Sequence, residues 1–546
     1  MFWRPMASQD DKFIKGAATL TVAGLVVKLI GALYRIPLYA VLGGEGMGLF
    51  GMAYPIYSII LTTSSAGLNV AISKAVAERW AMGRKEDARS VFRVSLFLMA
   101  AVGALGSAAL YGLRNFIAVE LARDPRAAVS IAAISPALFM ASVLSALRGW
   151  FQGIEEMTVP AVSQVLEQVG RLATMLLLAR ALMVRGLEYA AAGATFGAVV
   201  GAGLGVLYAA AAYRSHLLKL RSIDRRARRR QSGERGQDLP LTASETWGSA
   251  ARAVLSVAIP ISLASAVFGL TELVDLSLVP GRLQASGLPR EQATMLYGQL
   301  TQAALPLVNL ATIFTGAIQM AIVPSVTGAI AVGDRKAARR RMAKAVSITL
   351  FLALPAALGL YVLAGPIPYL LYGEPGLAPV LRPAAPAILF LALQQVTAGA
   401  LQGLGRVTAP LINLGIAVLV KIVLTYVLVA LPGVGVSGAA LATSVYFAVA
   451  ALLNFLSIHR EIGNVIEIGV LPKMAFAGVS MAAGAVLVHK VAVPTLGAKL
   501  AVVPAVGAGV VIYGMFALAL GTFGTGDLEA IPGLGRIVGR LAKRKR

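Results

Sequence analysis

Long apolar runs separated by short polar loops make up most of this chain. A run of about 20 apolar residues is long enough to cross a bilayer as a helix. Fourteen such spans are predicted, at residues 16–41, 49–76, 91–112, 128–149, 160–183, 188–212, 253–280, 303–330, 345–371, 384–403, 409–431, 435–457, 472–490 and 499–521. The first run is too long for a signal-peptide core, so we expect it to be retained. The pattern therefore predicts an all-α integral membrane protein.

Two stretches of the chain come into register at a shift of 250 residues. FQGIEEMTVPAVSQVLEQVGRL (151–172) matches LQGLGRVTAPLINLGIAVLVKI (401–422), and the match sets Arg171 on Lys421. We therefore predict two six-helix lobes, related by a parallel repeat about an axis along the membrane normal, and two further C-terminal helices. The predicted domains are 1–212 (spans 1–6), a basic cytoplasmic linker 213–252, 253–458 (spans 7–12), 459–521 (spans 13–14) and a basic amphipathic tail 522–546.

Composition supports the membrane assignment and narrows the chemistry. The chain is 58% hydrophobic and 14% charged, whereas soluble proteins carry about 25% charged residues. The absence of cysteine excludes disulfides and thiol chemistry. The three histidines are scattered, and no HExxH or GxxxxGK[ST] motif occurs. A membrane glycosyltransferase would need acids or histidines clustered at one membrane face, and the sequence has no such cluster. We expect no enzyme activity and no cofactor other than a coupling Na⁺ or proton, and the sequence contains no certain metal ligand.

The net charge of +24 is distributed as in a membrane protein. With an even number of spans and both termini in the cytoplasm, the cytoplasmic segments hold 31 of the 49 lysines and arginines, and the outer loops hold 7. The positive-inside rule predicts this orientation. Basic clusters at 221–230, 334–344 and 542–546 would attract anionic lipids at about 1 kcal/mol per residue. Nucleic acid is not an expected partner, and we expect a monomer.

Two cations lie inside the first predicted span. Lys28 and Arg35 are seven residues apart, so both leave the same face of a helix. A cation at membrane depth costs at least about 2.5 kcal/mol, which favours a wet, protein-lined cavity for an anion. Two alternatives stay open: Arg35 snorkels outward, or Lys28 pairs with a carboxylate on a neighbouring helix.

The fifth predicted span carries a polar stripe, formed by Gln164, Glu167, Gln168 and Arg171 at helical spacing. Glu167 and Arg171 are four residues apart and can neutralise each other, or the stripe can line a cavity. Lys421 has no carboxylate one turn away. It therefore needs a partner on another helix, water or a ligand.

Glu272 and Asp275 lie one turn apart near the outer end of the seventh span. Carboxylate oxygens suit hard cations, so the pair could bind a coupling Na⁺ or a proton. Alternatively, the two acids pair with Arg35 across the lobe interface, or they reach outer water.

Several stretches resemble the stage V sporulation protein B branch of the polysaccharide-export and lipid II flippase family, within the multidrug/oligosaccharidyl-lipid/polysaccharide superfamily. The resemblance runs through all fourteen spans and is carried by KLIGALYRIPLYAVLGGEGMGLFGMAYPIYS (28–58), GLNVAISKAVAE (67–78), ALRGWFQG (146–153), SQVLEQVGR (163–171), YGQLTQAALPLVNL (297–310) and KIVLTYVL (421–428). It implies a V-shaped, two-lobed transporter of the bacterial cytoplasmic membrane. Such a transporter moves undecaprenyl-pyrophosphate-linked sugars outward.

The resemblance also implies roles for single residues. Lys28, three residues before Gly31, matches a cavity cation of the lipid II flippases, and Arg35 lies within one residue of a second family arginine. Asp275 is a loose match to a carboxylate of the seventh span that the family associates with ion coupling.

One family feature is missing. The arginine that lipid II flippases use in the second span has no counterpart, because Ile59 and Ile60 occupy that region. Arg171 and Lys421 are the cations that would take its place.

The leading hypothesis is a flippase that holds the pyrophosphate of a lipid-linked cell-wall precursor with Lys28, Arg35, Arg171 and Lys421. The runner-up is a multidrug exporter of the same superfamily, an antiporter exchanging organic cations for Na⁺ or protons. Organic cations call for carboxylates at mid-depth, where this chain places mostly cations. A third hypothesis is a structural partner in a division or sporulation machine.

Overall fold

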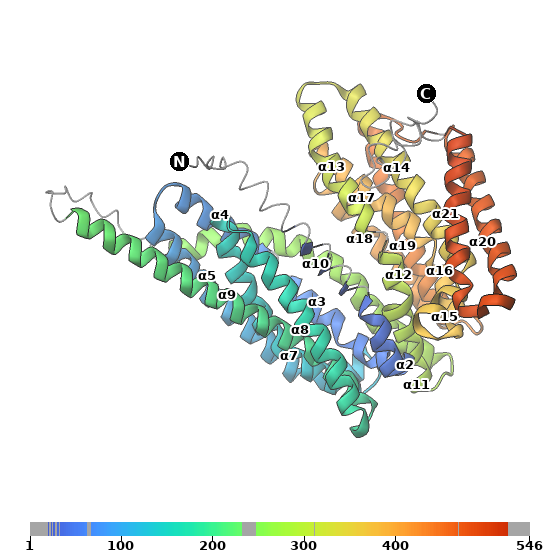
Figure 1. Cartoon of the computed structure of the whole chain (residues 1–546), viewed down its shortest axis with the longest axis horizontal. Helices are drawn as coiled ribbons and strands as arrows, with labels where there is room; N and C mark the ends of the chain where they lie inside the picture. The colour runs from blue at the N-terminus through green and yellow to red at the C-terminus, as the bar shows by residue number, and fades with distance from the viewer. Residues whose placement is uncertain are drawn as a thin grey trace, which may run out of the picture. The chain divides into compact units, whose positions relative to one another are not determined.

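The computed structural model describes residues 33–62, 67–231, 247–310, 312–467 and 469–521, with a few positions between 20 and 31. Every regular element in these ranges is a helix (Figure 1). Eleven helical segments of the described chain are long and apolar enough to cross a membrane. An all-helical membrane protein is thus confirmed, and the count of fourteen spans stays a prediction. Lys28 and the tail 522–546 lie outside the described residues.

Two predicted spans correspond to helices that are not among these eleven. α8 (Thr158–Leu182) has 25 residues and carries Glu167, Arg171 and Arg180. α10 (Trp247–Ala285) has 39 residues. Both exceed the roughly 20 residues that about 30 Å of hydrocarbon requires.

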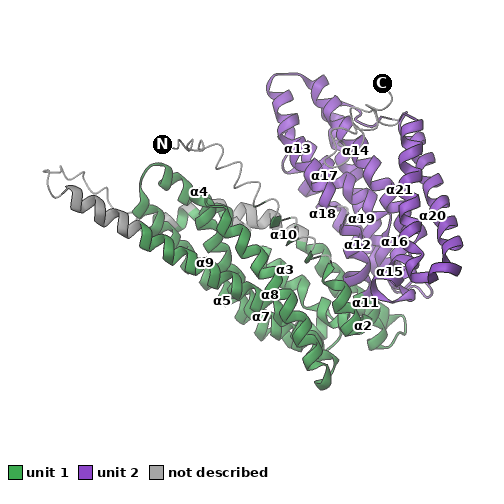
Figure 2. Cartoon of the chain, viewed as in Figure 1, with its two compact units in different colours: residues 1–298 green, residues 299–546 purple. Residues whose placement is uncertain are grey.

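The chain divides into two compact units, coloured separately in Figure 2. Unit 1 is Met1–Gly298. Besides α8 and α10 it contains α2 (Arg35–Met52), α3 (Tyr54–Leu61), α4 (Gly67–Ala81), α5 (Lys85–Gly112), α6 (Arg114–Phe116), α7 (Ala127–Gly153), α9 (Leu187–Gln231) and α11 (Arg290–Gly298), the π-helix η2 (Ile117–Leu121) and the 3₁₀ turn η3 (Met183–Arg185).

Unit 2 is Gln299–Arg546. It contains the π-helix η4 (Gln299–Ala304), α12 (Leu305–Asn309), α13 (Thr312–Ala331), α14 (Arg335–Val362), α15 (Pro366–Tyr372), the 3₁₀ turn η5 (Pro375–Leu377), α16 (Ala378–Ala384), α17 (Ala387–Gly403), α18 (Ala409–Leu428), α19 (Val436–Ile462), α20 (Leu471–Leu500) and α21 (Val502–Ala519).

The division between the units follows helix packing. α10 packs against α3, α4, α5 and α11, so it belongs to unit 1. The sequence-based domains begin the second lobe at residue 253, and that division stays a prediction. α9 continues to Gln231, so the linker expected at 213–252 starts as helix.

The predicted repeat is visible in the helix packing. α7 packs against α4, α5 and α9, and α17 packs in the same way against α13, α14 and α19. A Cβ added to Gly153 on α7 would lie 2.7 Å from the Cβ of Val76 on α4. The same position 250 residues later, Gly403 on α17, would lie 2.8 Å from the Cβ of Val326 on α13. The surroundings of α7 and α17 therefore match, including the close approach at Gly153 and Gly403.

The backbones of α2 and α11, which are far apart in the sequence of unit 1, approach each other closely. α2 bends at Gly43, which has φ 63°, where the sequence suggests a loop between the first two spans. Five residues later, a Cβ on Gly48 would lie 2.1 Å from the carbonyl oxygen of Thr294 on α11. Because only a residue without a side chain fits there, α2 and α11 pack backbone against backbone.

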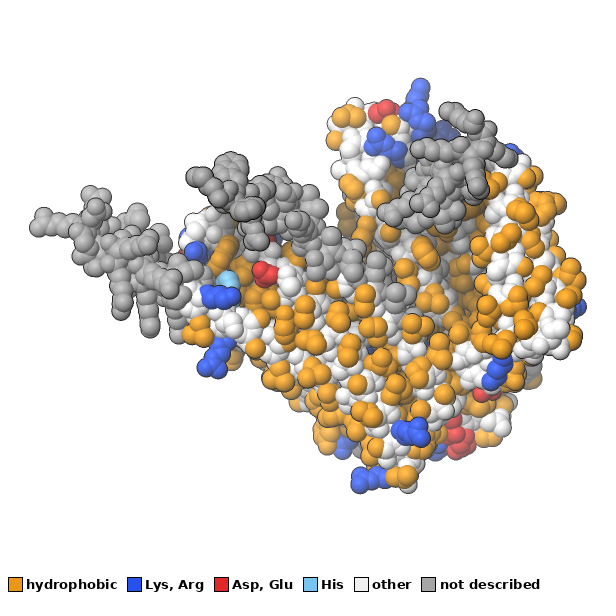
Figure 3. All heavy atoms as spheres, viewed as in Figure 1, with side chains coloured by type: hydrophobic (Ala, Val, Ile, Leu, Met, Phe, Trp, Pro, Cys, Tyr) orange, Lys and Arg blue, Asp and Glu red, His pale blue; other side chains and the backbone are white. Residues whose placement is uncertain are grey.

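Side chains on the surface separate by type. On the face drawn in Figure 3, hydrophobic side chains cover the flanks of the helices, and lysine, arginine and acidic side chains gather at helix ends. Large apolar residues such as Leu177 and Val510 are exposed on the flanks. A soluble monomer rarely exposes such a continuous apolar surface, whereas lipid covers it in a membrane protein.

Candidate functional site

The polar stripe of α8 meets an arginine from α7. Arg148 donates from Nη2 to Oε2 of Glu167 at 2.8 Å and from Nε to Oγ of Ser163 at 2.9 Å. The Arg148 and Glu167 side chains are only 15% and 21% exposed. Glu167 is therefore engaged across the helix pair, and the alternative that it neutralises Arg171 within α8 is not what the structure has.

Arg171, one turn beyond Glu167, contacts an aromatic side chain instead. Its Nη2 donates a hydrogen bond to the hydroxyl of Tyr54 on α3. The guanidinium carbon lies 5.1 Å from the centre of the same ring, within the range of a cation–π contact. The Nε of Arg171 is buried and makes no hydrogen bond within the described structure. A strong donor therefore stays available for an acceptor.

Arg35, at the start of α2, belongs to the same neighbourhood. It donates to the Gly31 carbonyl at 2.8 Å and lies 5.1 Å from the ring centre of Tyr34. The Tyr54 hydroxyl is within electrostatic range of both Arg35 and Arg171. The structure thus brings together two of the four predicted cavity cations. We call Arg35, Arg171 and the tyrosines Tyr34, Tyr54 and Tyr57 the arginine–tyrosine cluster.

A row of glycines on α9 positions α8. Gly193, Gly197, Gly201 and Gly205 recur every four residues and form one face of the helix. A Cβ on Gly201 would lie 2.4 Å from the carbonyl oxygen of Glu167 and 2.9 Å from the Cβ of Arg171. This glycine row lets α9 pack directly on the α8 backbone. The close packing fixes the position of the backbone that carries Glu167 and Arg171.

Two other members of the predicted stripe are placed less specifically. Gln164 and Gln168 are partly buried on the face of α8 that also bears Glu167. Their assignment to a cavity lining stays a prediction.

The two carboxylates of α10 differ in environment. Glu272 is exposed, whereas Asp275 is 3% exposed. No group of three or more His, Asp or Glu side chains that could hold a metal ion occurs in the part of the chain that the structure describes. Binding of a coupling Na⁺ or proton by these acids stays a prediction.

Lys421 lies inside unit 2. It is 2% exposed on α18, and its Nζ lies 5.8 Å from the ring centre of Tyr446 on α19. A cation over a tyrosine thus occurs at both repeat-related positions, Arg171 and Lys421. The convergence of Lys421 and the unit 1 arginines on one chamber stays a prediction.

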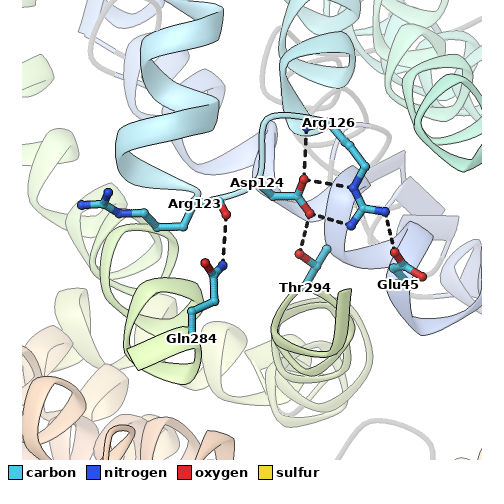
Figure 4. Close-up of polar contacts among 6 residues, drawn as sticks. All are labelled: Glu45, Arg123, Asp124, Arg126, Gln284 and Thr294. Carbon is cyan, nitrogen blue, oxygen red and sulfur yellow. Dashed lines mark hydrogen bonds and ion pairs between the residues drawn. The ribbon is translucent and has the colours of Figure 1, made fainter. Parts of the chain in front are cut away.

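A second polar assembly closes one end of unit 1 (Figure 4). Asp124 is fully buried and accepts hydrogen bonds from Arg126, at 2.7 Å from Nη2, and from the Thr294 hydroxyl of α11, also at 2.7 Å. Arg126 also pairs with Glu45 of α2 at 2.6 Å. Gln284 of α10 donates to the Arg123 carbonyl at 3.0 Å. We call the Asp124, Arg126, Glu45 and Thr294 set the aspartate clamp.

The electrostatics of the clamp favour an ionised aspartate. Burial alone would raise the pKa of Asp124, but hydrogen bonds from Arg126 and Thr294 outweigh it and lower the pKa below the ordinary value. Hydrogen bonds from Arg126 to Asp124 and Glu45 raise the arginine pKa in turn. The clamp therefore stays charged and closed at neutral pH.

Sequence reasoning missed Arg148, the three tyrosines and the clamp. Arg148 falls at the end of the predicted span 128–149, where a cation ordinarily reaches the interface. The signal that could have found it is the repeat, because the positions 250 residues after Arg148 and Glu167 are both alanine, Ala398 and Ala417. Opposite charges at two positions of one lobe, with alanine at both matching positions of the other, indicate that the two charged residues form a pair.

Family models and curated relatives agree with this fold. The model of the polysaccharide biosynthesis protein family matches residues 13–324, and the MatE model matches residues 301–427. The chain is 29% identical to stage V sporulation protein B of Bacillus subtilis (strain 168), over 85% of this chain and 86% of that protein. It is 27% identical to the lipid II flippase MurJ of the same organism, over 83% and 84%.

Solved structures give the same fold. The inward closed conformation of the lipid II flippase MurJ superposes with a TM-score of 0.68 at 15% identity, covering 92% of this chain and 98% of that one. An inward-facing multidrug resistance MATE family transporter of the MOP superfamily superposes with a TM-score of 0.64 at 16% identity, covering 81% and 98%. With its family model matched over more than half its length, this chain belongs to the polysaccharide biosynthesis protein family, and its candidate spans make it a multi-pass membrane protein.

Proposed function

We propose that this protein is a flippase that moves an undecaprenyl-pyrophosphate-linked sugar, lipid II or a related cell-wall precursor, across the bacterial cytoplasmic membrane by alternating access. The observation that carries the proposal is that Arg171 has a buried donor atom without an acceptor among the described residues. Its neighbour Glu167 is bound to Arg148, and its Nε is a buried donor without an acceptor in the described structure. A membrane-embedded guanidinium with an open donor is suited to a phosphate oxygen.

Charge in the arginine–tyrosine cluster favours an anion. Glu167 is neutralised by Arg148, so the acid of α8 does not offset the charge of Arg171, whose Nε makes no hydrogen bond in the described structure. The tyrosine hydroxyls add neutral groups that can donate or accept. Arginine holds phosphate oxygens in bidentate geometry. A pyrophosphate is therefore the headgroup we assign to this cluster, with the polyprenyl chain left in lipid.

The finer architecture is part of the proposal. We propose fourteen spans in two six-helix lobes plus two C-terminal helices, with both termini in the cytoplasm. Lys28 and Lys421 complete the phosphate-binding set in this scheme, and Glu272 and Asp275 bind the coupling Na⁺ or proton. Anionic lipids contact the basic loops and tail.

The second candidate is a multidrug exporter of organic cations. The MatE match over residues 301–427 and the superposition on a multidrug transporter favour it. Organic cations need an acceptor charge at mid-depth, and Glu167, the carboxylate nearest Arg171 along α8, is already bound to Arg148. The flippase is therefore the better supported function.

Reconstituted vesicles test the proposal. Flipping of a fluorescent lipid-linked sugar is measured for the wild type, Arg171→Gln and Arg180→Gln. Arg180 is an exposed arginine of the same helix, so Arg180→Gln is the matched control for charge loss. Loss of charge-assisted hydrogen bonds worth about 1.5–3 kcal/mol should slow Arg171→Gln roughly tenfold to a hundredfold and leave Arg180→Gln near wild type. Equal rates in the two variants, or transport of an organic cation untouched by Arg171→Gln, would refute the proposal.

A further inference from the structure

A second group of polar atoms lies at the other end of unit 1, away from the clamp. The rings of Trp80 on α4, Phe92 on α5, Trp150 on α7 and Tyr213 and His216 on α9 pack around one another. Trp150 lies 5.9 Å from Trp80, 5.5 Å from Tyr213 and 6.4 Å from His216, between ring centres. We call this group the aromatic box. Four helices converge on it.

Three nitrogen atoms of the box region are buried and make no hydrogen bond in the described structure. They are Nε1 of Trp150, Nε2 of His216 and Nε of Arg89. Trp150 is fully buried, so its indole N–H is not in contact with bulk water. A buried donor left unsatisfied costs about 1–3 kcal/mol. Nε1 of Trp150 and Nε of Arg89 can only donate, so these two unsatisfied atoms indicate a missing acceptor.

Arg89 is tied to the box by charge. Its guanidinium is within electrostatic range of both Tyr213 and His216. Its Nη1 pairs with Glu86, and its side chain is 14% exposed. The Nη1 of Arg89 is thus occupied by an exposed acid, whereas its buried Nε still lacks an acceptor among the described residues.

The surroundings of the box are predominantly basic. The Nζ of Lys85 lies 5.6 Å from the ring centre of Trp80. Arg93 is close enough to Tyr213, and Lys219 is close enough to His216, for their charges to interact. Among the described residues, the acids that act on the region are Glu86, paired with Arg89, and Glu156, near His216. The cations Lys85, Arg89 and Arg93 outnumber these two acids, so the environment is positive.

We propose that the aromatic box binds a phosphate group, of an anionic lipid headgroup or of free phosphate, through Trp150, Arg89 and His216. Indole and guanidinium N–H groups can only donate, so the ligand must present acceptors. The positive surroundings select an anion among acceptors. This site is separate from the arginine–tyrosine cluster and does not depend on the proposed transport activity.

The position of the box fits a headgroup. Lys85 begins α5 directly after the exposed turn that ends α4, so the box lies at helix ends. Tryptophan and tyrosine gather at this depth in membrane proteins because one part of the ring is apolar and another polar. On the orientation predicted from the basic loops, this end of unit 1 faces the cytoplasm, where anionic lipids carry the surface charge.

The test uses the full chain with three variants. Trp150→Phe removes the indole N–H, keeps an aromatic ring and leaves the surrounding cations unchanged. Arg89→Gln removes the guanidinium. Arg214→Gln is the control, because Arg214 is exposed and lies on the same helix as His216. Thermal unfolding of each variant establishes that it is folded, and Arg89→Gln carries the test if Trp150→Phe does not fold.

Two probes separate the sources of phosphate. Retention of phosphatidylglycerol against phosphatidylcholine is measured by native mass spectrometry, and binding of inorganic phosphate is measured by equilibrium dialysis. Loss of one hydrogen bond to a charged group should weaken binding about tenfold in Trp150→Phe and in Arg89→Gln, with Arg214→Gln within about twofold. That pattern with phosphatidylglycerol assigns a lipid headgroup, and that pattern with inorganic phosphate assigns the free ion.

The opposite results are equally clear. If neither probe binds, or if Trp150→Phe and Arg89→Gln bind both probes as the wild type does, the box holds water and the inference is wrong. If Arg89→Gln weakens binding and a folded Trp150→Phe does not, the effect is one of surface charge and the inference is again wrong.

Discussion

Glu167 of α8 is bound to Arg148 of α7, 19 positions earlier in the chain, with Nη2 and Oε2 2.8 Å apart. The pair joins two helices and removes the only acid of the α8 stripe from the reach of Arg171 along that helix. It therefore has two effects: it holds α7 against α8, and it leaves Arg171 in contact with Tyr54 of α3 instead of with the acid of its own helix.

The first prediction concerns the stability of this pair. Both side chains are largely buried, so Arg148→Met alone should lower the free energy of unfolding by about 3 kcal/mol, because it leaves a buried carboxylate without its partner. The double variant Arg148→Met/Glu167→Met should lose less than the sum of the single variants. Thermal and denaturant unfolding of the purified protein measures both.

The Arg406–Glu461 pair provides the control. It is separated by 2.7 Å, but its side chains are 62% and 35% exposed. Its removal should change stability by less than about 1 kcal/mol. Additive losses in the Arg148 and Glu167 double-mutant cycle would show that the two residues do not interact.

The second prediction concerns the glycine row of α9. Gly201→Ala should destabilise unit 1 by about 1–3 kcal/mol and slow transport, because the new Cβ would lie 2.4 Å from the Glu167 carbonyl oxygen and would push α8 away. Gly203→Ala, two residues along, meets no atom within 4 Å. It should be neutral or slightly stabilising, since alanine is favoured over glycine in a helix. Unfolding curves and flipping rates of both variants test this, and equal behaviour would contradict the packing described.

The third prediction concerns the pH dependence of the clamp. The folded-state pKa of Asp124 is lowered from its ordinary 3.8. A lowered pKa contributes stability that is fully present above pH about 3.8 and is lost as pH falls through the lower folded value. Asp124→Asn should therefore be less stable than the wild type at pH 7, and the difference should shrink below pH about 4.

Melting temperatures across that pH range measure the effect. Glu120→Gln is the control, because Glu120 is 52% exposed and its contact with Arg123 is 3.4 Å long. It should change stability by less than about 0.5 kcal/mol at any pH. A gap between wild type and Asp124→Asn that widens on acidification would reverse the sign and count against the clamp.

The fourth prediction concerns Lys421. Lys421→Met removes the ammonium group and keeps a side chain of similar length, so most of the buried volume is retained. The melting temperature of the variant establishes that it is folded. If Lys421 is a phosphate ligand, as the sequence predicts, the same variant should lose transport of the lipid-linked sugar. Transport at the wild-type rate would remove Lys421 from the binding set, and Tyr446→Phe, which keeps the ring beneath the ammonium, serves as the comparison.

Much of the fold was predictable because lipid imposes a simple rule. Apolar runs of about 20 residues predict helices regardless of what those helices pack against. The repeat was also readable, since Arg171 and Lys421 occupy equivalent positions in α8 and α18. The sequence did not predict where α9 ends. The apolar run marks only the part of a helix that lies in lipid, and the helix continues beyond that run as a polar segment.

The site was less predictable because its contacts are long-range. Helical spacing correctly grouped Glu167 with Arg171 on one face, but spacing within a helix says nothing of Arg148 on the next one. Tyr54 reads as one more apolar residue of a span. Asp124 lies in a loop and reads as a solvated charge, and only the fold brings Thr294 to it.

The α8–α9 hairpin is made of neighbours in the chain, separated only by Met183–Arg185 and Gly186. A short connection makes the pairing of two helices entropically cheap. When this hairpin emerges during synthesis, Arg148 and Tyr54 have already been made. The charged interior of unit 1 can thus be enclosed within the bilayer before any residue of unit 2 has been translated, which spares the nascent chain a prolonged exposure of bare cations to hydrocarbon.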